Sequence, residues 1–306
     1  MNLLSRKTIA ALLFSLSMGL TGYRYLHDQP MRPAPQKKGK VLCDLHAHPR
    51  NDASLDQIVE LLGSPGLVGL TQRPRNTDVL TYEEAIRKIK ASPYAPDLEE
   101  ITPGKLARFQ EGYFTRTEEI IAGRSFHFLA IGWDGNYFPH FRNAKAAITA
   151  IHSRQGLVML NHPYAINNGF KFRLPTTAEE QKIVEACALV DLVEVHNAHN
   201  IRTYMPGIDN MNDANDQAAR LVTTRCYGKA RGYVPAPVFS SDAHFQFDQV
   251  KITGIYVPAD SLRSMNHLKR ALRQERMERY GAYVSRFSFL QGVLFPRMSH
   301  SFKGAL

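Results

Sequence analysis

The sequence predicts an α/β fold, a distorted barrel formed by a single main domain. Short apolar runs the length of a strand alternate with helical patterns from residue 41 to about residue 280. This alternation is typical of βα units and a mostly parallel sheet. Seven runs over about 240 residues favour one closed or distorted barrel over two domains. The predicted strands are 41–46, 67–71, 126–132, 157–161, 192–196, 237–240 and 252–257.

Helical patterns fill the segments between these strands, and several start at capping residues. Ser54 and Thr81 stand at the start of two of them, and Thr177 is followed three residues later by Glu180. A hydroxyl at the start and a glutamate three residues on can satisfy the free amides of a first helical turn. The predicted helices are 54–62, 82–91, 143–154, 178–189, 212–222 and 261–276, and residues 92–115 are predicted to form an inserted excursion.

The positive charge of the chain is concentrated at its start. The formal net charge is +10, but the first 40 residues carry seven basic side chains and one acidic side chain. The remainder is only mildly basic, so charge alone does not imply a nucleic-acid partner. With 44% apolar residues, a disordered chain is excluded. The cations of the last predicted helix are interpreted as a solvated face: Arg263, Lys269, Arg270, Arg273, Arg276 and Arg279.

The first 40 residues are predicted to lie outside the barrel. Arg6 and Lys7 precede an apolar run at 9–20, which is typical of a secretory signal peptide; extended to Leu26, the run is a marginal signal anchor. We therefore expect a periplasmic or extracellular protein, or one anchored to the membrane by an uncleaved N-terminal segment. A linker rich in proline and lysine completes residues 1–40, followed by the barrel at 41–280 and a C-terminal tail at 281–306.

The three cysteines show no metal-binding or redox pattern. Cys43, Cys187 and Cys226 are widely spaced and form no CxxC motif. Cys43 in an apolar strand and Cys187 in a helix are predicted to be buried, inert thiols. A disulfide in an exported protein is the alternative that the sequence leaves open.

Histidines and acidic residues collect at the ends of the predicted strands. Asp44, His46 and His48 alternate along the first strand and therefore share one face. Two imidazoles at this spacing can bind one metal ion, and a neighbouring carboxylate can orient a ring.

Three further segments repeat this chemistry. His127 lies within a strand, His162 follows the strand at 157–161, and the pair Asp242 and His244 ends another strand. The carboxyl ends of barrel strands are where barrel enzymes place their sites. Because the pattern recurs in separate βα units, we interpret it as a metal site.

Taken together, these segments resemble the PHP (polymerase and histidinol phosphatase) family of metallohydrolases, over residues 41 to 280. The resemblance implies a TIM-like distorted (β/α)7 barrel, the PHP fold, as the single catalytic domain. It also implies hydrolysis of phosphomonoesters or phosphodiesters with divalent metal ions, commonly manganese, iron or zinc. The segments that carry it are Asp44–His48, Phe126–Gly132, Gly156–Pro163, Asp191–Asn197 and Ser240–His244.

The resemblance also implies the roles of individual residues. The metal-bridging glutamate of the family is best matched by Glu119, with Glu118 as the alternative. A metal-bound hydroxide would attack phosphorus, and His244 is a candidate to protonate the leaving group. Glu194 lies at a strand end, and two interpretations of it stay open: it supports the metal ligands or lines the pocket, or it is a solvated loop residue. The implied metal ligands are His46, His48, Glu119, His127, His162, Asp242 and His244.

One motif departs from the family pattern. Where the family has Thr-Asp-His, this chain has Thr71, Gln72 and Arg73, so a pair that helps to bind a third ion is missing. We therefore expect two divalent ions, with Arg73 near the third position and its guanidinium binding phosphate oxygens. The alternative is that Arg73 is a surface loop residue and the enzyme is impaired.

The predicted function is that of a metal-dependent phosphoric ester hydrolase. We expect a small phosphorylated substrate or a nucleotide, no dedicated nucleic-acid-binding module, and possible membrane anchoring through the N-terminus. Two alternatives remain: an amidohydrolase-like enzyme that cleaves C–N bonds, and a metal-binding module without catalysis. No lysine is obviously placed as a bridging carbamate, and Glu119, His127 and the Asp242–His244 ending favour the phosphoesterase.

Overall fold

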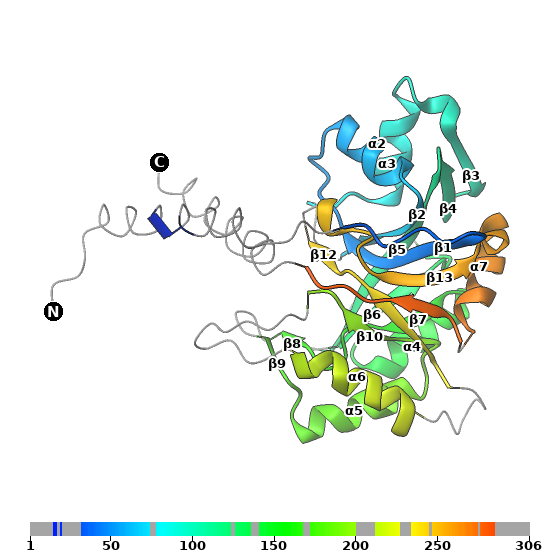
Figure 1. The fold of residues 1–306 in the computed structure, drawn as a ribbon. Helices are drawn as coiled ribbons and strands as arrows, with labels where there is room; N and C mark the ends of the chain where they lie inside the picture. Colours follow the sequence, from blue (N-terminus) through cyan, green and yellow to red (C-terminus); the bar gives the residue numbers. More distant parts are fainter. Residues whose placement is uncertain are drawn as a thin grey trace.

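In the computed structural model, the sheet closes because a strand near the start of the domain sequence pairs with one near its end (Figure 1). Strand β11 (Ala236–Ser240) leads directly into β12 (Ala243–His244), which pairs in parallel with the end of β1 (Lys40–His48). The order β11-β10-β7-β6-β5-β2-β1 makes a nearly closed barrel of seven strands, which confirms the predicted distorted barrel. The structure describes residues 15–16, 19, 32–73, 78–123, 126–135, 141–167, 172–199, 212–226, 234–244, 247–274 and 276–284.

The sheet is mixed, whereas the sequence predicted a mostly parallel one. Strand β5 pairs antiparallel with β6, through a turn that includes Gly123 in the left-handed region with a φ of 65°. Because β6 runs backwards, it begins at the end of the barrel where the parallel strands finish. The other strands of the barrel are β2 (Gly66–Gln72), β5 (Gly112–Ala122), β6 (Phe126–Ile131), β7 (Leu157–Leu160) and β10 (Leu192–Asn197).

Strand β5 was not predicted, because its first residues, 112–115, were assigned to the excursion at 92–115. Its charged residues conceal the pattern of a buried strand, although Glu118 and Glu119 are both fully buried. The excursion itself contains two further strands that extend the sheet beside β5. The strands outside the barrel are β3 (Leu98–Thr102), β4 (Leu106–Phe109), β8 (Ile166–Asn167), β9 (Phe172–Arg173), β13 (Gly254–Pro258) and β14 (Glu278–Tyr280).

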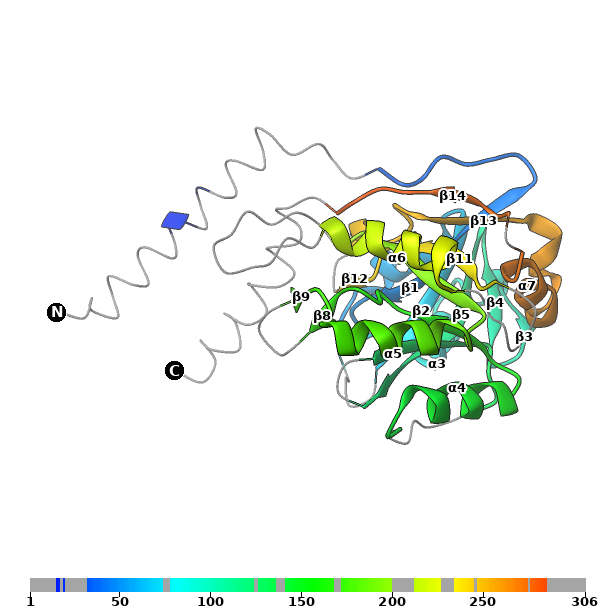
Figure 2. The same ribbon diagram turned by 90° about the horizontal axis from the view of Figure 1, so that it is seen from below.

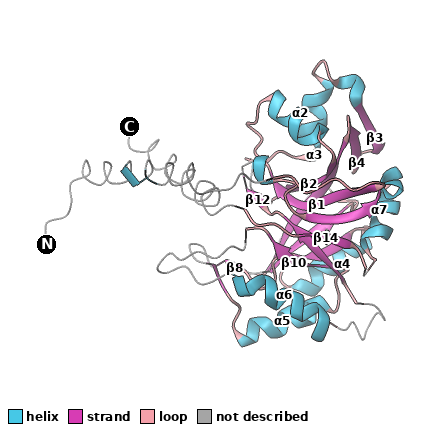
Figure 3. Cartoon of the chain, viewed as in Figure 1, coloured by secondary structure: helices cyan, strands magenta, loops and turns pink. Residues whose placement is uncertain are grey.

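The helices lie outside the barrel: α2 and α3 above the sheet, α5 and α6 below it, and α7 at one end, as drawn in Figures 1 and 3. Two begin with full capping boxes, at Ser54 with Gln57 and at Thr176 with Glu179, so the second cap lies one residue earlier than predicted. The helices are α2 (Leu55–Gly63), α3 (Tyr82–Lys90), α4 (Ala144–Ser153), α5 (Thr177–Cys187), α6 (Asn212–Thr224) and α7 (Met265–Leu272). Within the described ranges, short 3₁₀ turns lie at Ala95–Asp97, Phe247–Gln249 and Ala259–Arg263.

Helix α7 packs at the end of the barrel where the parallel strands begin (Figure 2). Leu268 and Leu272 join Leu45 and Leu157 in one buried apolar cluster. The Lys269 ammonium donates to the backbone oxygen of Gln155, just before β7, at 2.6 Å. Helix α7 thus covers one end of the barrel, and the histidines and acidic residues lie at the opposite end, where the parallel strands finish.

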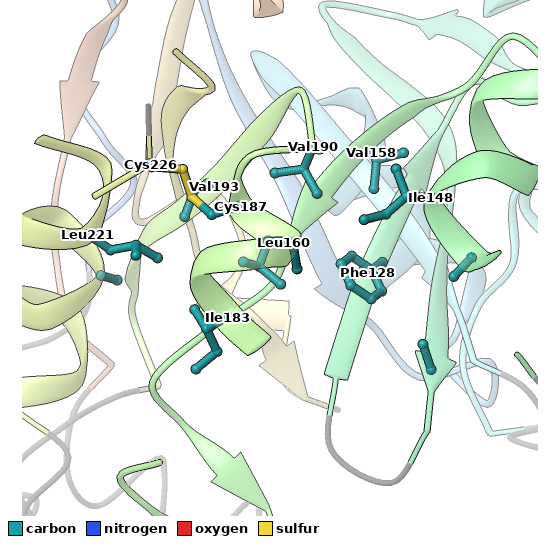
Figure 4. Close-up of a cluster of buried hydrophobic side chains, with 14 of the residues drawn as sticks. Phe128, Ile148, Val158, Leu160, Ile183, Cys187, Val190, Val193, Leu221 and Cys226 are labelled. Atoms are coloured by element: carbon teal, nitrogen blue, oxygen red, sulfur yellow. A yellow bond between two sulfur atoms is a disulfide. The ribbon is translucent and has the colours of Figure 1, made fainter. Parts of the chain in front are cut away.

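Cys187 and Cys226 form a disulfide, so the prediction that Cys187 is an inert thiol is wrong. The bridge joins the end of α5 to the second residue after α6, across 39 positions of sequence, in the apolar cluster of Figure 4. No local motif signals a pairing between two helices this far apart. Cys43 is free and buried, as predicted, and burial raises the pKa of its thiol.

The N-terminal predictions fall almost entirely outside the described residues. Of residues 1–31, only 15, 16 and 19 are described. Among the described residues, no helix combines the length and the apolar character needed to cross a bilayer. The targeting segment and the tail from residue 285 therefore stay predictions.

Candidate metal centre

Six predicted ligands form two groups at the end of the barrel where the parallel strands finish. In each group the ligand atoms lie within 4.8 Å of one another. These distances suit side chains that share one ion. The first group is His46, His48 and Asp242, and the second is Glu119, His127 and His162.

In the first group, two imidazoles and a carboxylate converge. The Nε2 atoms of His46 and His48 lie 3.1 Å apart. Asp242 Oδ1 is 3.4 Å from the first of these nitrogens and 3.6 Å from the second. The alternation of β1 therefore places both rings on one face, as predicted.

Hydrogen bonds behind both rings set their tautomers. His46 Nδ1 lies 3.0 Å from Glu194 Oε1, and His48 Nδ1 lies 2.9 Å from the Thr71 backbone oxygen. Since a carboxylate and a carbonyl only accept, each Nδ1 carries the proton when the ring is neutral. Each Nε2 then presents its lone pair to the cluster, the arrangement typical of metal-binding histidines.

Glu119 lies between the two groups. Its Oε1 is 2.8 Å from His127 Nδ1, 3.6 Å from His162 Nε2 and 3.8 Å from His46 Nε2. Its Oε2 is 3.7 Å from His48 Nε2. One carboxylate thus faces ligands of both groups, which is the placement expected of a bridge between two ions.

Arg73 pairs with the same carboxylate. Its Nε donates to Glu119 Oε2, and 26% of its side chain is exposed. Arg73 therefore lies at the edge of the cluster, and the alternative that it is a surface loop residue does not match this contact. Burial alone would raise the pKa of Glu119, but Arg73 and His127 hold it well below its usual range.

Glu194 connects three parts of the site, which the sequence left undecided. Besides His46, its carboxylate accepts hydrogen bonds from the Ser240 hydroxyl and from the His162 amide, the latter at 2.6 Å. Asn197 donates to Glu194 at 3.2 Å and to Asp242 Oδ2 at 2.9 Å. The sequence analysis did not identify Asn197 and Ser240 as site residues. Each is a polar residue at the end of an apolar strand, and this position could have indicated them.

Two of the ligands have an unusual backbone. His162 and Asp242 have φ values of 27° and 51°, in the left-handed region that residues other than glycine rarely adopt. Strain of this kind persists where the surroundings hold a residue in place, and it is common at functional sites. Here the His162 amide is held by Glu194, and the Asp242 amide donates to the His46 backbone oxygen at 2.7 Å.

The cluster has the chemistry of a cation site. Asp242 Oδ1 is buried and makes no hydrogen bond within the described part of the chain, and Glu119 Oε1 and His127 Nδ1, also buried, lie 2.8 Å apart without the alignment of a hydrogen bond. Burial alone would lower the pKa of His46, but the carboxylates of Asp242, Glu194 and Glu119 raise it to about 9. The buried carboxylates thus draw a proton onto a histidine when no metal ion balances them, so the residues present fit divalent ions.

Two acidic residues near the ligands have structural contacts instead. Asp44 accepts hydrogen bonds from the amides of Ser241 and Lys251, at 2.9 and 3.0 Å, so it holds two turns and orients no ring, contrary to expectation. Glu118 points away from Glu119 because neighbours on a strand face opposite sides. It binds Arg116 and accepts from Trp133 Nε1 at 2.9 Å, so the geometry favours Glu119 as the bridge.

His244 lies beside the first group and in neither of the two. Its ring centroid is 4.8 Å from that of His48, and its Nδ1 lies 2.6 Å from the Asp242 backbone oxygen. Because a carbonyl oxygen only accepts, this contact places the proton of the neutral ring on Nδ1. Burial lowers the pKa of His244 to about 4, so the ring suits a ligand or proton acceptor near neutral pH. Donation to a leaving group would first require its protonation.

Comparison with known proteins identifies structures of similar fold. No family model and no curated protein matches the sequence. PsfC from Pseudomonas syringae PB-5123 is 10% identical, with 87% of this chain and 99% of that chain covered and a TM-score of 0.48. A two-domain protein from Bacteroides vulgatus, containing a predicted PHP-like metal-dependent phosphoesterase, is 15% identical (86% and 73% covered, TM-score 0.47). The lesion-specific endonuclease PfuEndoQ from Pyrococcus furiosus is 13% identical (76% and 56% covered, TM-score 0.43). At these identities the likeness concerns the fold alone.

These neighbours contradict the predicted partners. The sequence predicted a small phosphorylated substrate or nucleotide, and no nucleic-acid module. A neighbour of similar fold is an endonuclease, and a structure of Endonuclease Q holds a 27-mer duplex substrate with an abasic lesion at the active site. The prediction of a small substrate without a nucleic-acid partner is therefore withdrawn.

We predict that Glu194→Gln weakens metal binding by about 10- to 100-fold, since groups that orient metal ligands commonly contribute this much. The amide keeps the shape of the side chain but removes the charge behind His46. Affinity is measured by competition with a chromophoric chelator, and Glu60→Gln, an exposed change on α2, is the matched control. Equal affinity in both variants would show that Glu194 does not prepare His46 for a metal ion.

Proposed function

We propose that this chain is a metal-dependent phosphoesterase of the PHP type. The observation that carries the proposal is the position of Glu119, buried and facing two groups of ligands at once. A carboxylate shared by two groups is the arrangement of two-metal hydrolases, which act on phosphoryl centres.

Two divalent ions fit the donor set. His46, His48 and Asp242 would hold one ion, His127 and His162 the other, and Glu119 would bridge them. Imidazole with carboxylate suits manganese, iron or zinc. When bound, such ions lower the pKa of water towards neutrality and neutralise charge on phosphoryl oxygens.

The chain itself contributes orientation and charge. Glu194 and the Thr71 carbonyl hold the two rings of β1, and Asn197 turns Asp242 towards them. Arg73, at the partly exposed edge, would bind a phosphoryl oxygen. His244 is assigned to the reacting groups, as a ligand or in proton transfer, because its ring lies next to His48.

The amidohydrolase alternative is less well supported. Such sites often use a lysine as a bridging carbamate, and here Glu119 has the bridging place. Among the described residues, the buried lysines are Lys251 and Lys269, and both donate to backbone oxygens away from the cluster. No described lysine is thus available as the bridge.

We predict that the purified chain binds about two metal equivalents and hydrolyses phosphate esters, and that Asp242→Asn loses at least about 100-fold in kcat/KM. The substrates are an aryl phosphomonoester, an aryl phosphodiester and DNA carrying an abasic lesion. The matched control is Asp56→Asn, an exposed change on α2. Hydrolysis that survives a chelator and Asp242→Asn would contradict the proposal; metal binding with cleavage of amides only would favour the amidohydrolase.

We also propose that Arg73 supplies the positive charge that a third ion gives in the family pattern. Arg73→Gln is then expected to lower kcat/KM by about 10- to 100-fold without loss of bound metal, while Arg73→Lys recovers part of the rate. Unchanged kinetics in Arg73→Gln, with Asp242→Asn inactive, would reject this role. Loss of metal in Arg73→Gln would instead assign Arg73 to the balance of charge at Glu119.

We further propose that the chain functions outside the cytoplasm. The apolar run at 9–20 supports this, as does the disulfide between Cys187 and Cys226, since disulfides persist in oxidising compartments. Residues 1–40 fused to a reporter that is active only after export are expected to give activity, and Leu13→Arg is expected to abolish it. An inactive wild-type fusion, made in equal amount, would contradict export.

A further inference from the structure

A hollow lies at the end of the barrel away from the metal centre. It has a volume of about 710 Å³ and lies between α7 and the turn from α4 to β7. This end, where the parallel strands begin, is opposite the metal centre. Its lining residues are His152, Gln155, Gly156, Ser264, Asn266, His267, Lys269, Arg270 and Arg273.

Two cations of α7, Lys269 and Arg270, line this hollow together with Arg273, which caps the end of the helix. The sequence predicted a solvated face here, but Lys269 is only 7% exposed. Burial, together with Lys105, lowers the pKa of its ammonium to about 8. The ammonium donates a hydrogen bond to a neutral acceptor, the Gln155 backbone oxygen. A charge buried beside other cations is costly unless an anion compensates it.

The nearby acids leave part of this charge unbalanced. Asp191 binds His152 at 2.8 Å and Arg273 at 3.2 Å, and Asp134 pairs with Lys105. Arg270 is exposed, and no carboxylate in the described residues forms an ion pair with it. The hollow therefore has an excess of positive charge.

We propose that this hollow binds an anion that carries a phosphate group. A guanidinium group can donate two parallel hydrogen bonds to the oxygens of one phosphate, and an ammonium can donate a further one. Ser264, Asn266 and Gln155 surround these cations with polar groups, which suits a charged ligand better than an apolar one. The volume lies within the range of ligand sites. The phosphate is either free or part of a nucleic-acid strand, and the site is independent of the metal centre.

The test follows the imidazole signals of His152 and His267 by NMR as the metal-loaded protein is titrated. One series uses inorganic phosphate and the other a 5′-phosphorylated single-stranded oligonucleotide. Because these rings line the hollow, their shifts report on it even if phosphate also binds at the metal centre. Arg270→Glu changes an exposed lining residue, and Arg263→Glu, exposed on the preceding 3₁₀ turn and outside the lining, is the matched control.

The proposal predicts saturable shifts in the wild type and in Arg263→Glu, with affinity at least about tenfold weaker in Arg270→Glu. Saturation by phosphate alone identifies a free anion, and tighter binding of the oligonucleotide identifies a strand. Shifts that do not saturate, or equal affinity in both variants, would overturn the site. Neither result depends on hydrolysis at the metal centre.

Discussion

The carboxylate of Glu119 is fully buried between imidazoles, and the need to balance its charge constrains the whole site. A buried anion is stable only beside a positive partner. Arg73 supplies one on Oε2, whereas Oε1 faces His127, His162 and His46 without a hydrogen bond within the described residues. A divalent ion beside this carboxylate would balance its charge, and the imidazoles of His127, His162 and His46 lie around Oε1.

The barrel brings these ligands together through the direction of its strands. Parallel strands finish at one end, which gathers His48 and Asp242 from elements almost 200 residues apart. The reversal of β6 is what adds His127, because an antiparallel strand begins where its neighbours finish. Glu194 then ties β10 to His46, His162 and Ser240, so that three strand ends share one hydrogen-bonded support.

Much of this arrangement could be predicted from the sequence. Alternation along β1 predicted the shared face of His46 and His48, and βα periodicity predicted the barrel. The antiparallel hairpin could not be predicted, because the charged residues of β5 are buried by tertiary contacts that no local pattern encodes. The contact of Arg73 with Glu119 and the disulfide between Cys187 and Cys226 also join distant elements, so sequence spacing carried no signal for them.

Lys269 illustrates the same limit at the other end of the barrel. A helix rich in arginine and lysine reads as a solvated face, but tertiary packing of α7 turns one of its cations inward. Burial is decided by the neighbours of a helix as much as by its own periodicity.

The most direct test of the account is anomalous diffraction from crystals grown with Mn²⁺, recorded where manganese scatters strongly. The account predicts two peaks, one among His46, His48 and Asp242 and one among His127, His162 and Glu119, with Glu119 contacting both. No peak at the cluster, with Arg73 still paired to Glu119 at saturating metal, would contradict the assignment of this cluster as a two-metal centre.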